Sequence, residues 1–490
     1  MKISNKFIFA SSQSKIFGLS SGYGLILLLI LIIHLLGFVF SAVHFPGSLV
    51  LFGLYSLVSA FSLFIGFYKP FDYGMPLLNI FLWLGGWLKL TTHLILQYQY
   101  VEAVGGFSFS ADQYNELLKV CIVSNLAIFF VWFFSKRIIK TSCIHINLKN
   151  KNIITLSSLN FKLILSLVLI SIAVINLFNI YSGMYQTGIV AKTIYIWPVN
   201  AVFGWVLSMG LVMVISALLY LSSCSKGRVT AVIVVAIFEA IFSAASVLSR
   251  GLYIIHLLPV FYSVALNKCR LGLKRKIFIF LAVIGITGFI ISGTFVNIAR
   301  TFAYNENSSM TVGRNYALRM GFSDAFQGFK SLAIMGVDRW IGIEGVMVAV
   351  GYPAKSMKLL GALMVEKPAI GYITKYQYIA NSVYVHMNAN KFQFLTLPGP
   401  AGMFYLSGSL FIVFIGMALL LLLAILFERW VWLMTSNPYL CAVMGAWMAN
   451  GVAQLGVAPR QLLIQLFMHF IGVFVIAIFQ KWYLKANNLS

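Results

Sequence analysis

Long apolar runs alternate with short polar links along most of this chain. Runs of about twenty mostly apolar residues have the length of a helix that crosses the hydrocarbon core of a bilayer. We identify twelve such runs. Four of them cover residues 23–43, 76–96, 277–296 and 401–426. The pattern predicts an all-α polytopic membrane protein with about twelve transmembrane helices.

One polar and aromatic stretch, residues 297–399, interrupts this pattern. It divides the chain into residues 1–296 with nine spans, the large loop 297–399, and residues 400–490 with three spans and a tail. Functional groups concentrate in such loops, because a membrane span cannot keep them solvated. Two segments in the loop, residues 335–350 and 354–365, have helical periodicity. We expect short amphipathic helices there, lying along the membrane surface.

The distribution of Lys and Arg predicts the orientation of the spans. Basic residues concentrate in the short links 136–151, 226–228 and 268–276. Short links rich in Lys and Arg face the cytoplasm. Both termini are therefore expected in the cytoplasm, and the large loop on the opposite, periplasmic side. Because no A-x-A cleavage pattern follows the first apolar run, we expect it to be retained as a span.

Composition excludes several functional classes. Only 9% of the residues are charged and 61% are hydrophobic, whereas a soluble domain carries about 25% charged residues. The net charge of +24 is accounted for mainly by the cytoplasmic links, so we expect membrane lipids as partners and no nucleic acid. The five cysteines lack metal-ligand spacing. With no nucleotide-binding or metal motif either, neither a metal nor another cofactor is expected.

Several arginines stand where the expected outer surface lies. Arg250 and Arg460 each occupy a very tight outer turn between two spans, against the usual charge trend. Further arginines of the same kind lie in the large loop: Arg314, Arg319 and Arg339. Guanidinium groups bind phosphate through paired hydrogen bonds, so this set predicts a pyrophosphate site. The alternative is that each arginine simply reaches the lipid headgroups.

Two residues of the loop are candidate catalytic bases. A carboxylate such as Glu344 or an imidazole such as His386 can activate a hydroxyl group. Glu344 is equally compatible with a structural ion pair, and His386 with a structural role. Lys89, His93 and Glu239 fall within predicted spans. Ionisable groups there are functional candidates because their burial is costly.

Three features of the chain occur together. They are the twelve-span plan, the Ser249-Arg250-Gly251 hairpin, and the sequence Arg339-x-x-Gly342-x-Glu344-Gly345 in a large late loop. This combination resembles the Wzy-type O-antigen or capsular repeat-unit polymerases. The resemblance implies a glycosyltransferase of the bacterial inner membrane. It would join undecaprenyl-pyrophosphate-linked oligosaccharides on the periplasmic face. The arginines would stabilise the lipid pyrophosphate leaving group without a metal. The resemblance also makes a chain-length regulator and a flippase candidate partners.

Three other readings remain open. An O-antigen ligase or another lipid-linked glycan transferase has a similar number of spans and one large outer loop. A flippase or secondary transporter predicts charged residues at mid-depth in the bundle and short loops throughout. A scaffold without catalytic activity would not need arginines at tight outer turns.

Overall fold

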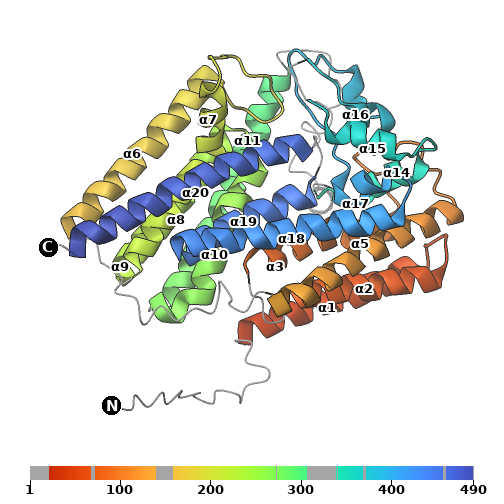
Figure 1. Ribbon diagram of the computed structural model, residues 1–490, viewed down its shortest axis with the longest axis horizontal. Helices are drawn as coiled ribbons and strands as arrows, with labels where there is room; N and C mark the ends of the chain where they lie inside the picture. The colour runs from red at the N-terminus through yellow and green to blue at the C-terminus, as the bar shows by residue number, and fades with distance from the viewer. Residues whose placement is uncertain are drawn as a thin grey trace, which may run out of the picture.

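The computed structural model describes residues 21–67, 72–138, 158–223, 225–271, 273–305, 338, 340–367, 371–455 and 459–488. Within these ranges the regular elements are helices, and one isolated antiparallel bridge joins Ile189 to Phe392. The prediction of an all-α chain is confirmed for this part of the protein. Figure 1 shows long helices packed side by side, with the short helices α14, α15 and α16 gathered at one end of them.

Each predicted span is helical. The spans are α1(Ser21–Ala42), α2(Leu49–Phe67), α3(Gly74–Leu82) with η1(Trp83–Leu88) and α4(Lys89–Leu96), α5(Ala111–Ile138), α6(Ser158–Ser182), α7(Val199–Trp205) with η3(Val206–Gly210) and α8(Leu211–Ser222), α9(Lys226–Ser246), α10(Arg250–Leu271), α11(Arg275–Asn305), α18(Leu410–Thr435), α19(Pro438–Ala453) and α20(Pro459–Asn488). Among the described residues, eight helical segments are long and apolar enough to cross a membrane. A multi-pass membrane protein is therefore supported, while the total of twelve spans and the side on which the large loop lies stay predictions.

The third and sixth spans each contain a π-helical turn, η1 and η3. A π-turn widens the helix and takes carbonyl groups out of the regular hydrogen-bond ladder, and such turns are frequent at functional sites. In the described part of the chain, both π-turns lie beside buried charged residues.

Two helices differ in extent from the apolar runs that predict them. The ninth helix, α11, continues to Asn305 and so includes the start of the expected loop. The tenth helix, α18, runs from Leu410 to Thr435, because Gly408 at φ 80° separates it from the short helix α17(Gly399–Tyr405). Glu428, expected in a cytoplasmic link, is consequently buried inside α18. It accepts hydrogen bonds from the backbone N–H groups of Tyr73 (2.7 Å) and Gly74 (2.9 Å) at the start of α3.

The links predicted on the outer side meet at one end of the bundle. The Gln97 amide lies 3.1 Å from Nδ1 of His44. The Gly105 N–H donates to the Ala380 carbonyl at 3.1 Å, and the Thr187 N–H donates to the Val247 carbonyl at 2.8 Å. The described segments that meet in this way are 43–48, 97–110, 183–198, 247–249, 340–367 and 371–398, together with residue 338, and we call this region the loop end.

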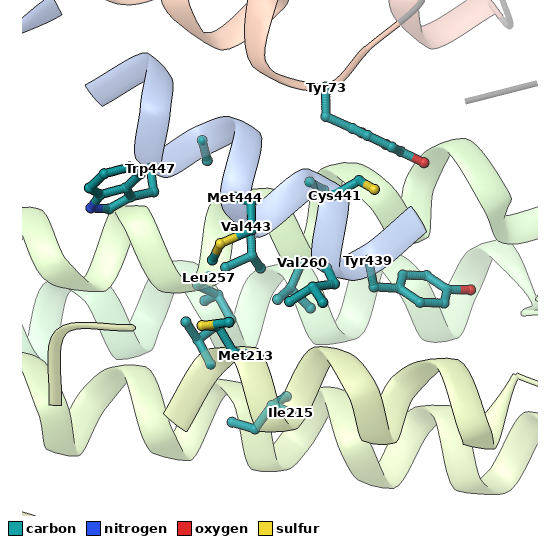
Figure 2. Packing of buried hydrophobic residues seen from close by; sticks show 14 of the residues in the cluster. Tyr73, Met213, Ile215, Leu257, Val260, Tyr439, Cys441, Val443, Met444 and Trp447 are labelled. Atoms are coloured by element: carbon teal, nitrogen blue, oxygen red, sulfur yellow. The ribbon is translucent and has the colours of Figure 1, made fainter. Parts of the chain in front are cut away.

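The helix α19 forms the centre of the bundle. Of its residues only Asn450 and Gly451 are not buried. It packs against α3, α8, α10 and α18, and Figure 2 shows Val443 and Met444 of this helix close to apolar side chains of α8 and α10. Between membrane helices the stabilising force is close van der Waals packing, because lipid is as apolar as the side chains. A helix without charged residues suits this central position.

Part of the large loop is not at the surface. The amphipathic helix expected over residues 354–365 is present as α15(Met357–Met364). In contrast, every residue of α14(Ile343–Gly351) from Ile343 to Val350 is buried. Glycines allow this burial. A Cβ atom at Gly345 would overlap the Pro398 carbonyl group, and one at Gly402 would overlap the Gly345 carbonyl. The expectation that the first segment lies on the membrane surface is therefore wrong.

The close contact between α14 and α17 leads to a stability prediction. Gly345→Ala should destabilise the protein by about 3 kcal/mol or more, because the new methyl group meets rigid backbone. The measurement is thermal unfolding of the protein in nanodiscs, followed by tryptophan fluorescence. Gly361→Ala in α15 is the matched control, since its Cβ would enter open space and alanine favours a helix by up to about 1 kcal/mol. Equal melting temperatures for the two variants would contradict this packing.

Candidate functional site

Four ionisable side chains converge where α4 reaches the loop end. Lys89 and His93 stand one turn apart on α4, and Asp338 and Glu344 come from the large loop. All four residues are buried, with Lys89 having no exposed surface. We call them the charged cluster. It joins the third predicted span to a segment about 250 residues later in the chain.

The Lys89 ammonium group has three acceptors. It donates to the carbonyl oxygens of Asp338 (2.9 Å) and Trp340 (2.8 Å), and it forms an ion pair with the Glu344 carboxylate. A buried ammonium group is tolerated only when its three N–H donors have acceptors, and here three acceptors surround it. The two carbonyls belong to the chain just before α14. Lys89 therefore fixes the path by which the loop enters the bundle.

His93 and Asp338 form a second buried pair. Nδ1 of His93 lies 3.0 Å from the Tyr98 carbonyl, and Nε2 lies 2.7 Å from Oδ1 of Asp338. A carbonyl oxygen only accepts, so Nδ1 carries a proton and donates it there. The contact between Nε2 and Oδ1 then holds one further proton, shared by the imidazole and the carboxyl group. The His93 ring also stacks between Tyr98 and Tyr100, with centroid distances of 3.9 and 3.8 Å.

Two carboxylate oxygens of the cluster lack a hydrogen-bond donor among the described residues. They are Oδ2 of Asp338 and Oε2 of Glu344. Buried oxygens without a donor are uncommon, and they mark places where a ligand or water completes the site. Burial raises the pKa of Glu344 above its ordinary value, and the positive charge of Lys89 offsets part of that rise. A carboxyl group with a raised pKa is well suited to take up a proton.

A cavity of about 550 Å³ lies next to the charged cluster. We call it the first cavity. It is lined by His93, Leu94, Gln97, Tyr98, Gln99, Tyr100, Val101, Glu102, Ala103, Val104, Phe109, Tyr114, Asn381, Ser382, Val383 and Tyr384. Its volume falls within the range of roughly 300–1,000 Å³ that small-molecule sites occupy. His93 and Tyr98 belong to its wall and both contact Asp338, so the cavity and the carboxylates are one layer of side chains apart.

The wall of the first cavity combines aromatic rings with amide and hydroxyl groups and with one carboxylate, that of Glu102. This combination suits a sugar, whose ring faces are apolar and whose edges carry hydroxyl groups. Burial raises the pKa of the Tyr98 and Tyr100 hydroxyls, so both stay protonated and neutral. The segment that supplies most of the wall, residues 97–104, was expected from the sequence only as an outer link.

The candidate residues predicted from the sequence lie in different environments. Glu344 is buried in the ion pair with Lys89, whereas His386 is exposed at the end of η4(Val383–His386). Arg250 begins α10 and lies beside Gly293 of α11, and Arg460 is exposed at the second position of α20. The other three predicted arginines, Arg314, Arg319 and Arg339, lie outside the described residues.

A third buried pair, formed by Glu239 and His256, lies within the predicted spans. Nδ1 of His256 on α10 is 2.9 Å from Oε1 of Glu239 on α9, and Nε2 is 2.6 Å from the Ser208 carbonyl in the π-turn η3. Ser243 donates to the same carboxylate at 2.7 Å. The sequence singled out Glu239 but not its partner, because residues 17 positions apart on separate helices share no local pattern.

Among the described residues, no group of three His, Cys, Asp or Glu side chains has a geometry that could hold a metal ion. The described residues Cys121 and Cys441 form no disulfide and are buried. Comparisons of this chain with protein-family models, with curated proteins and with solved structures give no match.

The ion pair of Lys89 with Glu344 can be tested by a double-mutant cycle. Lys89→Met should destabilise the protein by about 3–5 kcal/mol, because it leaves the Glu344 carboxylate and two carbonyl groups buried without a donor. Glu344→Gln should cost less, since Lys89 keeps its two carbonyl acceptors. The double variant should be more stable than the sum of the single costs predicts.

Thermal unfolding in nanodiscs measures all three variants, with Lys358→Met as the control because Lys358 is exposed on α15. Strictly additive costs would show that the two side chains do not interact.

Proposed function

We propose that this protein is a membrane glycosyltransferase that joins lipid-linked oligosaccharide units, as the Wzy-type polymerases do. The observation that carries the proposal is the first cavity, with its aromatic and amide wall next to buried carboxylates. Such a wall suits the sugar of an acceptor unit, and the carboxylates suit the removal of a proton from its hydroxyl group. The resemblance of the sequence to the polymerase family supports the same conclusion.

The proposed reaction needs one base and one stabilised leaving group. The acceptor hydroxyl oxygen forms a bond to the anomeric carbon of the donor sugar, and the bond from that carbon to the lipid pyrophosphate breaks. Asp338 does not line the first cavity, so the hydroxyl proton reaches it through Tyr98. The Tyr98 hydroxyl lines the cavity and donates to Oδ1 of Asp338 at 3.4 Å, so it takes up the acceptor proton as it passes its own proton to the carboxylate. Glu344 stands behind it, and it remains a candidate base together with the exposed His386.

Cationic side chains serve the leaving group in this proposal. Negative charge grows on the pyrophosphate oxygen as the bond to the sugar breaks, and positive charge placed beforehand lowers the energy of that state. The predicted arginines Arg250, Arg460, Arg314, Arg319 and Arg339 are the candidates for this role. An O-antigen ligase would use the same chemistry with a different acceptor, so the product distinguishes the two enzymes.

Deleting the protein and separating surface glycans on a gel tests the proposal. A polymerase predicts loss of the ladder with retention of core plus one repeat unit, whereas a ligase predicts loss of all capped material. Asp338→Asn should reduce chain lengthening about 100-fold or more, which is the usual contribution of a general base. Asp112→Asn is the control, because Asp112 is exposed at the start of α5. Normal chain lengthening by Asp338→Asn at normal protein levels would contradict the role of Asp338.

A transporter of lipid-linked units is the second candidate, and the buried Glu239–His256 pair favours it. A charged pair within the spans is what transport predicts. Under the polymerase proposal, Glu239→Gln cells with normal protein levels still carry single lipid-linked units on the outer face. Labelling these units with a lectin on spheroplasts measures this. Absence of labelling in the variant and in the deletion strain would support transport instead.

A further inference from the structure

A second cavity, of about 280 Å³, opens on another side of the loop end. Its wall comes from the ends of α6, α9 and α11 and from two loops. It is lined by Ile180, Gln186, Ile189, Lys192, Ala245, Ser246, Leu248, Phe295, Ala299, Lys391 and Phe392. Among the described residues of this wall none is acidic, and two are lysines.

The two loops of the second cavity are held together by backbone hydrogen bonds. Ile189 and Phe392 form an antiparallel bridge. The Val190 N–H donates to the Lys391 carbonyl at 3.0 Å, and the Gln393 N–H donates to the Gly188 carbonyl at 3.2 Å. This register places Lys192 and Lys391 on the same cavity, although they are far apart in the sequence. These backbone contacts between the two loops therefore hold both lysines at the cavity.

Further positive charge lies close to the second cavity. Arg300 on α11 follows Ala299 of the wall, and its Nε donates to the Leu248 carbonyl at 2.9 Å. Arg250, at the start of α10, packs beside Gly293, which lies two turns before Arg300 on α11. Positive groups gathered without a carboxylate in the wall favour an anion. Lysine ammonium groups bind phosphate as point charges, without the fixed fork of arginine.

The second cavity is accessible from the lipid. Only 17% of the apolar window of α6 and 28% of that of α11 are buried, so both helices expose apolar surface along most of their length. At the cavity itself Ile180 is 50% exposed and Phe295 is 51% exposed. A phosphate group carried on a lipid can therefore reach the lysines while its hydrocarbon tail stays beside α6 and α11.

A row of aromatic rings connects the two cavities. Phe392 of the second cavity stacks on Phe394 with a centroid distance of 5.9 Å, and Phe394 stacks on Tyr384 of the first cavity at 5.2 Å. Sugar rings pack their apolar faces on such surfaces. The three rings form a continuous row between the two cavities, in which Phe392 is buried while Phe394 and Tyr384 keep part of their surface exposed.

We propose that the second cavity binds the phosphate group of a lipid-linked oligosaccharide through Lys192 and Lys391, and that the sugars lie along Phe392, Phe394 and Tyr384 toward the first cavity. This inference rests on the proposed function, which it extends by assigning a place to the acceptor lipid, whose outermost sugar then reaches the first cavity. The required chemistry is a phosphoester at the membrane surface. An isoprenoid phosphate and an ordinary anionic phospholipid both provide it.

The test uses the full-length protein in phosphatidylcholine nanodiscs, with native mass spectrometry to measure lipid binding. Undecaprenyl phosphate is one probe and phosphatidylglycerol is the other. Lys192→Ala and Lys391→Ala should each weaken binding of undecaprenyl phosphate about tenfold, since a hydrogen bond to a charged group contributes about 1.5 kcal/mol or more. Lys358→Ala is the control, and Lys192→Arg with Lys391→Arg should keep binding.

Each outcome has a clear meaning. Weaker binding of undecaprenyl phosphate alone supports an isoprenoid phosphate as the ligand. Equal weakening for both lipids supports the phosphate site but assigns it to anionic lipids in general. Unchanged binding by the correctly folded double alanine variant overturns the site. If binding weakens but deletion of the protein leaves surface glycans unchanged, the phosphate site stands and the proposed function fails.

The aromatic row is tested by Phe394→Leu, which keeps an apolar side chain but removes the ring face. This variant should weaken binding of a lipid-linked oligosaccharide and leave binding of undecaprenyl phosphate, which has no sugar, unchanged. Equal binding of the lipid-linked oligosaccharide by the variant and the wild-type protein overturns the sugar path.

Discussion

The buried ammonium group of Lys89 is the interaction on which the loop end depends. A charge without exposed surface must be paired and hydrogen-bonded, or it costs several kcal/mol. Here the partners are the Glu344 carboxylate and the carbonyls of Asp338 and Trp340. These contacts fix the chain that enters α14, and they bring Asp338 to His93. The wall of the first cavity, the orphaned carboxylate oxygens and the burial of α14 all follow from this one anchoring point.

The two π-turns give a common reason for the positions of the buried charges. In η3 the Ser208 carbonyl accepts a hydrogen bond from His256, and in η1 the backbone of Gly85 lies against Ile341, next to the Lys89 contacts. A widened turn turns carbonyls aside and opens room at the helix surface. In both cases one ring N–H of an imidazole donates to a carbonyl oxygen, and the other ring nitrogen shares a proton with a buried carboxyl group. The fold thus places polar groups inside apolar helices without leaving their donors unsatisfied.

The sequence was sufficient to predict the helices but not the contacts that form the site. Apolar runs located the helices, because the length of such a run corresponds to a helix that can cross a membrane. The helices α11 and α18 extend beyond their apolar runs, since a helix can continue when its polar residues find partners, as Glu428 does at Tyr73 and Gly74. The burial of α14 was missed although Gly342, Gly345 and Gly402 carry the signal. Small residues show that two backbones can approach, but not which two. The partners of Lys89 and Glu239 depend on packing over long sequence separations.

The charges of the two cavities indicate that each cavity binds a different end of one lipid-linked oligosaccharide. A phosphate in the first cavity would lie near Asp338, Glu344 and Glu102, and repulsion from these carboxylates would disfavour it. The same phosphate in the second cavity meets Lys192 and Lys391, and the described residues of that wall include no acidic one. A neutral sugar has no such preference and takes the cavity with rings and amides. Discrimination of this kind needs repulsion as well as attraction. The electrostatics therefore orient a lipid-linked oligosaccharide with its phosphate at the lipid-exposed cavity and its sugars toward the carboxylates, which is the direction that a transfer reaction at Asp338 requires.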